Sequence, residues 1–263
     1  MLVDYHLHSD FSEDSSCPME KIIKQAIKLN FDEICMTDHV DYFARKKSHR
    51  FDFDHYIAEI SRFQKKYGDQ IRIRLGMEFG MQVHTIPSYR ALLDKYQLDF
   101  VILSNHQTDD KEYWNDEFQW GRSHSEYTRE YYRELRDVIA EFKDYSVLGH
   151  LDVIKRYGRW NPSDDEDCED IIKEILNIAI QDGKGIELNA SSFRYQLPDL
   201  TPSRAILEWY YEMGGKILTF GSDGHDVSQV GAHVATVREV AKEIGFREFC
   251  TFQNMHPTFH PIG

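Results

Sequence analysis

The feature that most constrains the fold is the regular alternation of short apolar segments with segments of helical periodicity. Seven apolar segments are typical of strands, at residues 1–8, 32–37, 71–78, 99–104, 146–149, 185–188 and 216–221. Seven helices are predicted between and after them, at residues 18–30, 53–67, 89–96, 123–142, 168–181, 203–213 and 233–244. This alternation favours parallel strands joined by right-handed crossovers. Because the strands are apolar throughout, we expect both faces of the sheet to be covered.

Seven strand–helix units fit a closed or nearly closed barrel better than an open sheet. We therefore predict an α/β fold, a TIM-like barrel in which residues 1–263 form a single domain, since barrels of this length are commonly one domain. The longest connections, at 40–52 and 106–122, follow the second and fourth strands. In a barrel they would lie at the C-terminal ends of the strands, where barrel enzymes keep their active sites.

Histidine and acidic side chains follow one expected strand after another. His6 and His8 are two residues apart, so both imidazoles point to the same side of a strand. Glu78 ends an apolar strand, where a carboxylate is costly unless it is paired or bound to a metal. The full set is His6, His8, Asp14, His39, Glu78, His106, His150, Asp223 and His225. One histidine at a strand end is more often a hydrogen-bonded interior residue, but their joint placement predicts a metal site.

Composition excludes several other functions. The formal net charge is −14, with 31 basic and 45 acidic side chains, and no basic face is evident, which disfavours nucleic acid as the main partner. The four cysteines form no C-x-x-C pair, so we expect reduced thiols and no zinc–thiolate site. No apolar run approaches the roughly 20 residues that span a bilayer, and the apolar start is too short for a secretion signal. We therefore expect a cytoplasmic protein with no membrane partner.

The order of these residues resembles that of the PHP (polymerase and histidinol phosphatase) superfamily over nearly the whole chain. The motifs that carry the resemblance are H-x-H at His6 and His8, T-D-H ending at His39, Glu78, His106, G-H at His150, and S-D-x-H at Asp223 and His225. Two further phrases, Gly149-His150-Leu151-Asp152 and the stretch from Ile186-Glu187-Leu188-Asn189 to Arg194, resemble the histidinol-phosphatase branch.

The resemblance implies a distorted (β/α)7 barrel that holds three divalent ions. His6, His8, Glu78 and Asp223 would hold the first ion; Glu78, His106 and His150 the second; Asp14, His39 and His225 the third. Asp10 and Glu13 are alternatives to Asp14 in the same loop. Mixed imidazole and carboxylate ligands accept Zn, Mn, Fe or Co.

The activity that the resemblance implies is that of a metal-dependent histidinol-phosphatase, which hydrolyses L-histidinol phosphate to L-histidinol and phosphate in histidine biosynthesis. The chain has no recognisable serine, cysteine or aspartate nucleophile motif, so our hypothesis is attack by a hydroxide that bridges two ions. We expect Glu78, Asp223 and His225 to be catalytic. Spacing alone indicates only a phosphate ester. A phosphodiesterase or exonuclease, a phosphatase for another small ester, and a metal-stabilised binding module are the alternatives.

Basic side chains are needed to complete a phosphate pocket. Arg194 follows the one strand without a predicted metal ligand, and the resemblance supports it as a phosphate contact. Lys155, Arg156 and Arg159 are second choices, for which a solvated loop charge is the alternative interpretation. The long loops offer unranked partners for the amine and imidazole of the substrate: Asp41, Tyr42, Phe43, Asp109, Asp110, Glu112, Trp114 and Glu117.

Overall fold

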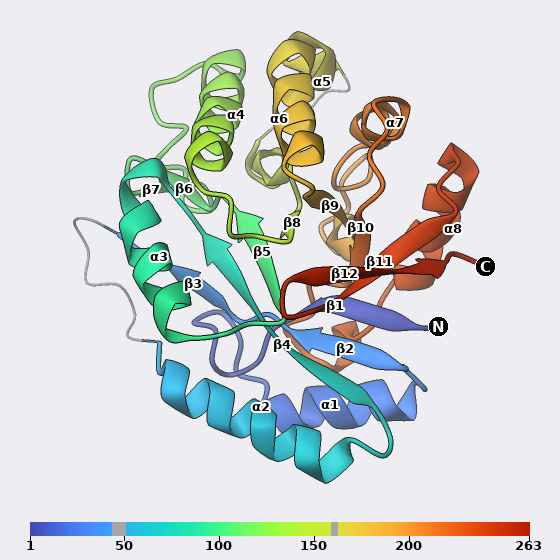
Figure 1. The fold of residues 1–263 in the computed structure, drawn as a ribbon. Coiled ribbons are helices and arrows are strands. Elements are labelled where there is room, and N and C mark those ends of the chain that lie inside the picture. The colour runs from blue at the N-terminus through green and yellow to red at the C-terminus, as the bar shows by residue number, and fades with distance from the viewer. Residues whose placement is uncertain (44–50, 159–162) are drawn as a thin grey trace.

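The chain folds into a nearly closed barrel of seven parallel strands with helices around it (Figure 1). The structure is a computed structural model, and it describes residues 1–43, 51–158 and 163–263. In chain order and in spatial order the barrel strands are β1 (Val3–Leu7), β2 (Glu33–Met36), β4 (Arg72–Gly80), β5 (Phe100–Ser104), β8 (Val147–Leu148), β9 (Gly185–Asn189) and β10 (Leu218–Gly221). The predicted fold class is confirmed.

The barrel closes where the end of β1 meets the segment after β10. The amide of His8 donates to the carbonyl of Gly224 at 2.9 Å, and Leu7 and Gly224 form a parallel bridge. A short strand, β3 (His39–Asp41), pairs in parallel with the last residues of β4 and brings His39 level with Glu78. The ends of four separate strands are therefore held together by backbone pairing.

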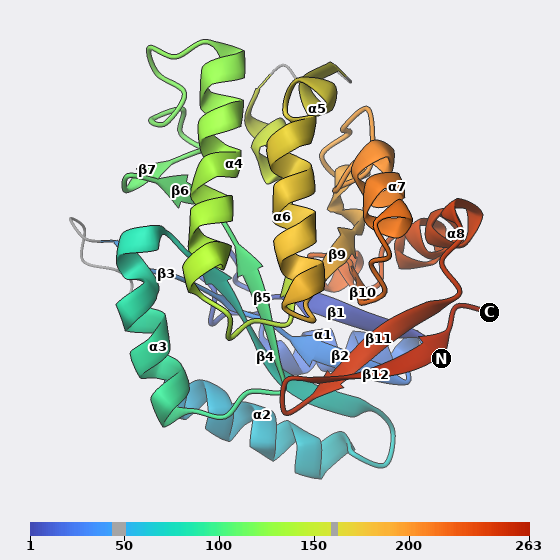
Figure 2. The same ribbon diagram turned by 45° about the horizontal axis from the view of Figure 1, so that its top comes forward.

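The helices lie outside the barrel strands, and α4, α6 and α7 stand side by side in Figure 2. They are α1 (Met19–Lys28), α2 (Phe53–Tyr67), α3 (Ile86–Lys95), α4 (His124–Glu141), α5 (Ser163–Asp167), α6 (Glu169–Gln181), α7 (Arg204–Glu212) and α8 (Val234–Ile244). Single 3-10 turns occur at Val83–Thr85, Val153–Tyr157, Ala190–Ser192 and Val227–Gln229. Of these, only the short α5 and the 3-10 turns lie outside the predicted helices. No helix in the described ranges is long and apolar enough to span a membrane.

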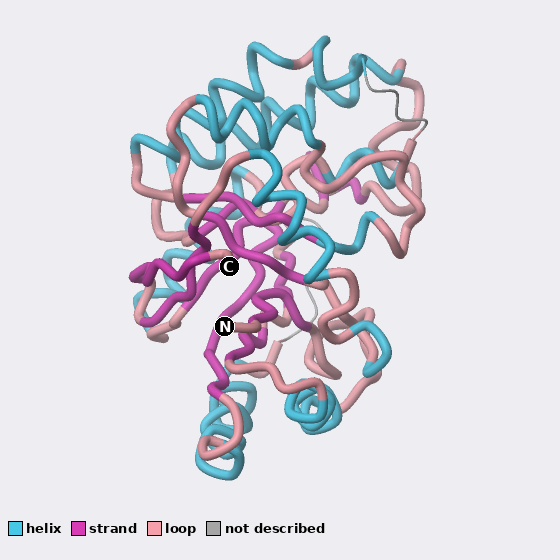
Figure 3. Tube along the Cα trace, turned by 90° about the vertical axis from the view of Figure 1, so that its right-hand side faces the viewer, coloured by secondary structure: helices cyan, strands magenta, loops and turns pink. Residues whose placement is uncertain are grey.

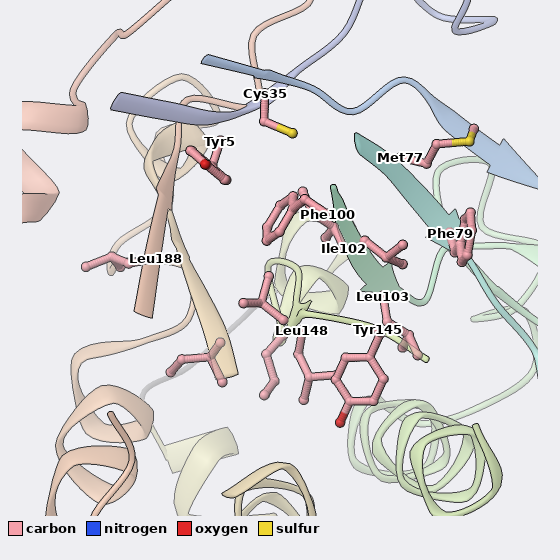
Figure 4. Packing of buried hydrophobic residues seen from close by; sticks show 14 of the residues in the cluster. Tyr5, Cys35, Met77, Phe79, Phe100, Ile102, Leu103, Tyr145, Leu148 and Leu188 are labelled. Atoms are coloured by element: carbon pink, nitrogen blue, oxygen red, sulfur yellow. The ribbon is translucent and has the colours of Figure 1, made fainter. Parts of the chain in front are cut away.

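Side chains from both faces of the strands form the core. Every residue of β1, β2 and β5 is buried, as expected of strands that are covered on both sides. Figure 4 shows Tyr5 and Phe100 pointing toward one another inside the barrel, and their ring centroids are 5.0 Å apart. This packing fixes the strands whose C-terminal ends carry the histidines.

A C-terminal hairpin covers the N-terminal ends of the strands. It was not predicted from the sequence. It consists of β11 (Glu248–Gln253) and β12 (His256–Pro261) in antiparallel pairing. The amide of Met255, in its turn, donates to the carbonyl of Asp99 at 2.9 Å, just before β5. The two chain ends lie near one another (Figure 3), and the guanidinium of Arg238 donates to the carbonyls of Met1 and Ile262. A second hairpin, β6 (Gln107–Thr108) and β7 (Lys111–Glu112), lies in the loop after β5.

Candidate metal centre

The histidine and acidic residues at the strand ends converge at the C-terminal end of the barrel. His6 lies in β1, His39 begins β3 and Glu78 lies in β4. His8 follows β1, and its ring centroid is 4.9 Å from that of His6, as the two-residue spacing predicts. The other members follow β5, β8 and β10: His106, His150, Asp223 and His225. These eight predicted residues thus reach one site.

Glu78 is the centre of this cluster and is almost completely buried. Its Oε2 atom lies 3.1 Å from His6 Nε2 and 3.5 Å from His8 Nε2. Its Oε1 atom lies 2.8 Å from His150 Nε2 and 3.2 Å from His106 Nε2, and it also accepts a hydrogen bond from Ser104. Each carboxylate oxygen therefore faces its own pair of imidazoles, as a carboxylate that bridges two ions would.

Asp223 completes the group around His6 and His8. Its Oδ1 atom is 3.4 Å from His8 Nε2 and 3.8 Å from His6 Nε2. Two ligands about 2.1 Å from a tetrahedral ion lie roughly 3.4 Å apart. The four separations between these two imidazoles and the two carboxylates, Glu78 and Asp223, span 3.1–3.8 Å and match that spacing.

Asp14 is the acidic residue of the first loop whose carboxylate lies between two of the histidines. Its Oδ1 atom is 3.0 Å from His39 Nε2, and its Oδ2 atom is 3.1 Å from His225 Nε2. The side chain is 57% exposed, so this third group forms the outer part of the site. The ring of His225 stacks on that of His8 at 4.0 Å, which joins the third group to the first.

The electrostatics of the cluster suit metal ligands. Burial, together with the positive charge of His225, lowers the pKa of His8 to about 3, so its imidazole is neutral and keeps a lone pair. Burial alone would raise the pKa of the Glu78 carboxyl, but the charges of His6 and His106 outweigh it and hold the pKa well below its usual range. The site thus combines ionised carboxylates with an imidazole lone pair.

A direct test of fit comes from a buried nitrogen without a partner. His8 Nε2 is buried and forms no hydrogen bond within the described part of the chain. A buried polar atom without a partner is costly, and an ion is one way to satisfy it. Four triads have ligand atoms within 4.8 Å of one another: His6, His8 and Asp223; His6, Glu78 and His150; His8, His39 and His225; and His39, Asp41 and His106. The donor set therefore fits divalent metal ions.

Two carboxylates contact the histidines from outside the cluster. Neither was predicted from the sequence to be part of the metal site. Glu187, in β9, accepts a hydrogen bond from His6 Nδ1 at 2.6 Å. Asp41, considered above only as a substrate contact, lies against the Nδ1 atoms of His39 and His106. The sequence signal for Glu187 was available, because a buried carboxylate in the middle of an apolar strand requires a partner.

Arg194 and Arg156 both reach Asp223, at the edge of the site. The Arg156 guanidinium is buried and its Nη2 atom lies 2.8 Å from Asp223 Oδ2. The Arg194 guanidinium donates to the carbonyl of Asp223 at 2.7 Å and is 26% exposed. Both cations lie over the ring of Tyr195. Two positive charges therefore lie beside the clustered carboxylates and imidazoles.

Lys155 is not brought to this edge. The Lys155 ammonium lies between two buried carboxylates, 2.5 Å from Asp152 Oδ2 and 3.0 Å from Asp165 Oδ2. Arg159 lies outside the described residues. Among the loop candidates, Asp110 accepts from Gln82 and His84, and Trp114 is 69% exposed.

Two hollows differ in their relation to the cluster. A small one of about 30 Å³ is lined by Phe11, Glu13, His39, Val40, Asp41, Phe43 and Phe51 and opens beside the third group. A larger one of about 690 Å³ lies at the N-terminal end of the barrel, where its lining includes Arg90, Lys184 and Met255. The larger hollow contains none of the clustered residues, so it and the cluster lie at opposite ends of the barrel.

Comparison with known proteins gives consistent matches. The family model described as "PHP domain" matches residues 4–191. A histidinol-phosphatase from Lactococcus lactis is 32% identical over 96% of this chain and 95% of its own length. A probable histidinol-phosphatase from Thermotoga maritima is 27% identical over 93% of each chain. A crystal structure of histidinol phosphate phosphatase from Lactococcus lactis, complexed with zinc, L-histidinol and phosphate, superposes with a TM-score of 0.89 at 30% identity and covers 98% of both chains.

Proposed function

This chain belongs to the PHP domain family, and we propose on that premise that it is a histidinol-phosphatase, a phosphoric monoester hydrolase. Its reaction is the hydrolysis of L-histidinol phosphate to L-histidinol and phosphate, a step of histidine biosynthesis. The single observation that carries this proposal is the full-length match to the Lactococcus lactis structure that holds zinc, L-histidinol and phosphate. Imidazole and carboxylate groups, which bind zinc, gather at one end of this barrel.

The proposed metal centre holds three divalent ions. The ligands of the first are His6, His8, Glu78 and Asp223; those of the second are Glu78, His106 and His150; those of the third are Asp14, His39 and His225. The two oxygens of Glu78, each facing a separate histidine pair, support its role as a bridge between the first two ions. Zinc is the first metal to test, because it is the ion named in the solved relative.

When bound, such ions offset the negative charge on the phosphoryl oxygens and lower the pKa of water at the site. The residues of this chain set the protonation state of the ligands and bind the phosphate. Glu78 and Asp223 are held ionised, and His8 is held neutral, so these three ligands can bind metal without losing protons, whereas the protonated imidazoles of His6 and His106 would each release one. The Arg194 and Arg156 guanidinium groups at the edge are placed to take the remaining phosphate oxygens, which guanidinium binds with paired hydrogen bonds.

His225 and Asp223 are the proposed catalytic partners of Glu78. His225 Nδ1 lies 2.9 Å from the carbonyl of Asp223, which orients the ring so that Nε2 points to Asp14 at the outer side of the site. Asp223 has a left-handed backbone, with φ of +55°, which aspartate tolerates better than most residues. This turn directs its carboxylate toward His6 and His8.

The test is release of inorganic phosphate from L-histidinol phosphate, compared with other small phosphate esters and with a polynucleotide. We expect turnover of L-histidinol phosphate, loss of activity after chelation, and recovery with Zn²⁺ or Mn²⁺, with metal content measured on the same sample. His8→Gln should abolish activity. His256→Gln, at the exposed start of β12 and far from the cluster, is the matched control and should leave the activity unchanged. Nucleotide release without phosphate release from the small ester would refute the proposal.

A further inference from the structure

One partly buried carboxylate, that of Asp41, contacts two imidazoles that belong to different proposed ion sites. Asp41 Oδ2 lies 2.6 Å from His39 Nδ1, and Asp41 Oδ1 lies 2.8 Å from His106 Nδ1. Each separation is that of a hydrogen bond, and each uses its own oxygen. Since a neutral imidazole carries one proton, a proton held at Nδ1 leaves the Nε2 lone pair free. The Nε2 atoms of these rings face Asp14 and Glu78 respectively, inside the site.

The backbone beneath this contact has no room for a side chain. A Cβ atom added to Gly80, in β4, would lie 1.7 Å from Asp41 Oδ1 and 2.8 Å from His106 Nδ1. Gly80 does not have the positive φ that favours glycine. Glycine is needed at this position because a side chain would clash with Asp41, and not because of the backbone conformation. The Asp41 carboxylate can therefore occupy this position only because residue 80 is glycine.

The same arrangement recurs on the other side of the barrel with different residues. Glu187 Oε1 accepts from His6 Nδ1 at 2.6 Å, and Glu187 Oε2 accepts from the amide of His150 at 3.0 Å. A Cβ atom added to Gly221, in β10, would lie 2.3 Å from Glu187 Oε1. His6 and His150 are proposed ligands of the first and second ions. A second carboxylate thus links two ion sites from outside.

We propose that Asp41 and Glu187 are positioning residues that hold ligand imidazoles of neighbouring ion sites in the tautomer and orientation that metal binding requires. Asp41 holds His39 of the third site and His106 of the second. Glu187 holds the ring of His6 in the first site and the backbone beside His150 in the second. The inference rests on the metal centre of the proposed function. It adds that the ion sites are coupled through these two carboxylates.

Asp41→Asn separates this role from a merely structural one. The amide has a single acceptor oxygen, so it can accept from only one of the two Nδ1–H groups, and its NH₂ group faces the other ring. That ring is then favoured in the tautomer with its proton at Nε2, which cannot bind an ion. We expect the affinity for at least one ion to fall by about 10–100-fold, as for other outer partners of ligand histidines.

Gly80→Ala should reproduce this loss, because it displaces the carboxylate while leaving its chemistry intact. Gly76→Ala is the matched control. It lies in the same strand, and its added Cβ would meet Cys35 Sγ at 2.5 Å, so it too is crowded. That crowding is in the core and does not reach the site. We expect Gly76→Ala to lower the melting temperature and to keep the metal affinity of the wild type.

The experiment measures bound zinc per chain by equilibrium dialysis, together with ¹H–¹⁵N correlation spectra of histidine-labelled, zinc-loaded protein. The wild type should show His39 and His106 with a proton on Nδ1 and zinc on Nε2. Zinc on Nδ1 of either ring in the wild type would overturn the inference even if no variant folds, as would unchanged zinc affinity in Asp41→Asn. A wild type that binds no zinc or manganese would instead refute the metal centre itself.

Discussion

Replacing Lys155 by methionine should destabilise the fold without impairing phosphate binding. The Lys155 ammonium is buried between Asp152 and Asp165, and all three side chains are at most 4% exposed. Removing the cation leaves two buried carboxylates without their counterion, and breaking a buried pair in this way costs about 3–5 kcal/mol. At roughly 2–4 °C per kcal/mol for a chain of this size, the melting temperature should fall by about 6–20 °C.

The assay is thermal unfolding of Lys155→Met beside steady-state kinetics at a temperature where the variant stays folded. Lys143→Met is the matched control, because that ammonium also contacts a carboxylate, Asp182 at 2.6 Å, but is 42% exposed. An exposed pair contributes about 1 kcal/mol or less, so its melting temperature should fall by no more than about 4 °C. An unchanged melting temperature with a raised KM for L-histidinol phosphate would refute the reasoning and make Lys155 a phosphate contact.

Three other results are expected. Glu78→Gln should lower kcat/KM by at least about 10²-fold and reduce the amount of bound metal, because mutating even an outer partner of a metal ligand lowers metal affinity or activity by about 10–100-fold. Full metal binding in this variant would contradict the bridging role. Arg194→Ala should raise the KM by about 10–100-fold, the value of one charged hydrogen bond, and Arg194→Lys should recover part of it in the same kinetic assay. Burial alone would raise the pKa of Glu33, but hydrogen bonds led by Arg74 outweigh it and lower the pKa below its ordinary 4.5. The ionised Glu33 therefore stabilises the fold above about pH 4.5, and this stabilisation is lost as the pH falls through the lower folded pKa. Arg74→Gln should reduce the fall in melting temperature that the wild type shows below about pH 5.

The barrel could be predicted because each strand is a short apolar run and each helix has an apolar stripe of period 3.6. The C-terminal hairpin could not be predicted in the same way. Its turn places Asn254 and Met255 at φ of +50° and +64°, positions where Asn-Gly is the usual signal and methionine gives none. Its second strand contains Pro257 and Pro261, and proline argues against a strand. Pairing with β11 at the base of the barrel overrides these local preferences.

The convergence of the proposed metal ligands could be predicted because they follow strands that the pattern locates, and parallel strands end at the same edge. Their outer partners could not. Asp41 lies two residues after His39 and has the same loop setting as Tyr42 and Phe43, so nothing in the order of residues separates a partner of histidine from a substrate contact. Which carboxylate meets which Nδ1 atom depends on strands that are neighbours only after the barrel closes.

The strand without a metal ligand shows why closure matters. β9 lies between β8 and β10. Its Glu187 accepts a hydrogen bond from the amide of His150, which follows β8, and another from the ring of His6, which lies on β1 on the far side of β10. It can do so because Gly221, on β10, has no side chain in its path. A metal ligand at position 187 would contact one ion. The Glu187 carboxylate instead lies outside the ligands and contacts residues of two proposed ion sites. The absence of a ligand on β9 is therefore part of how the site is held together.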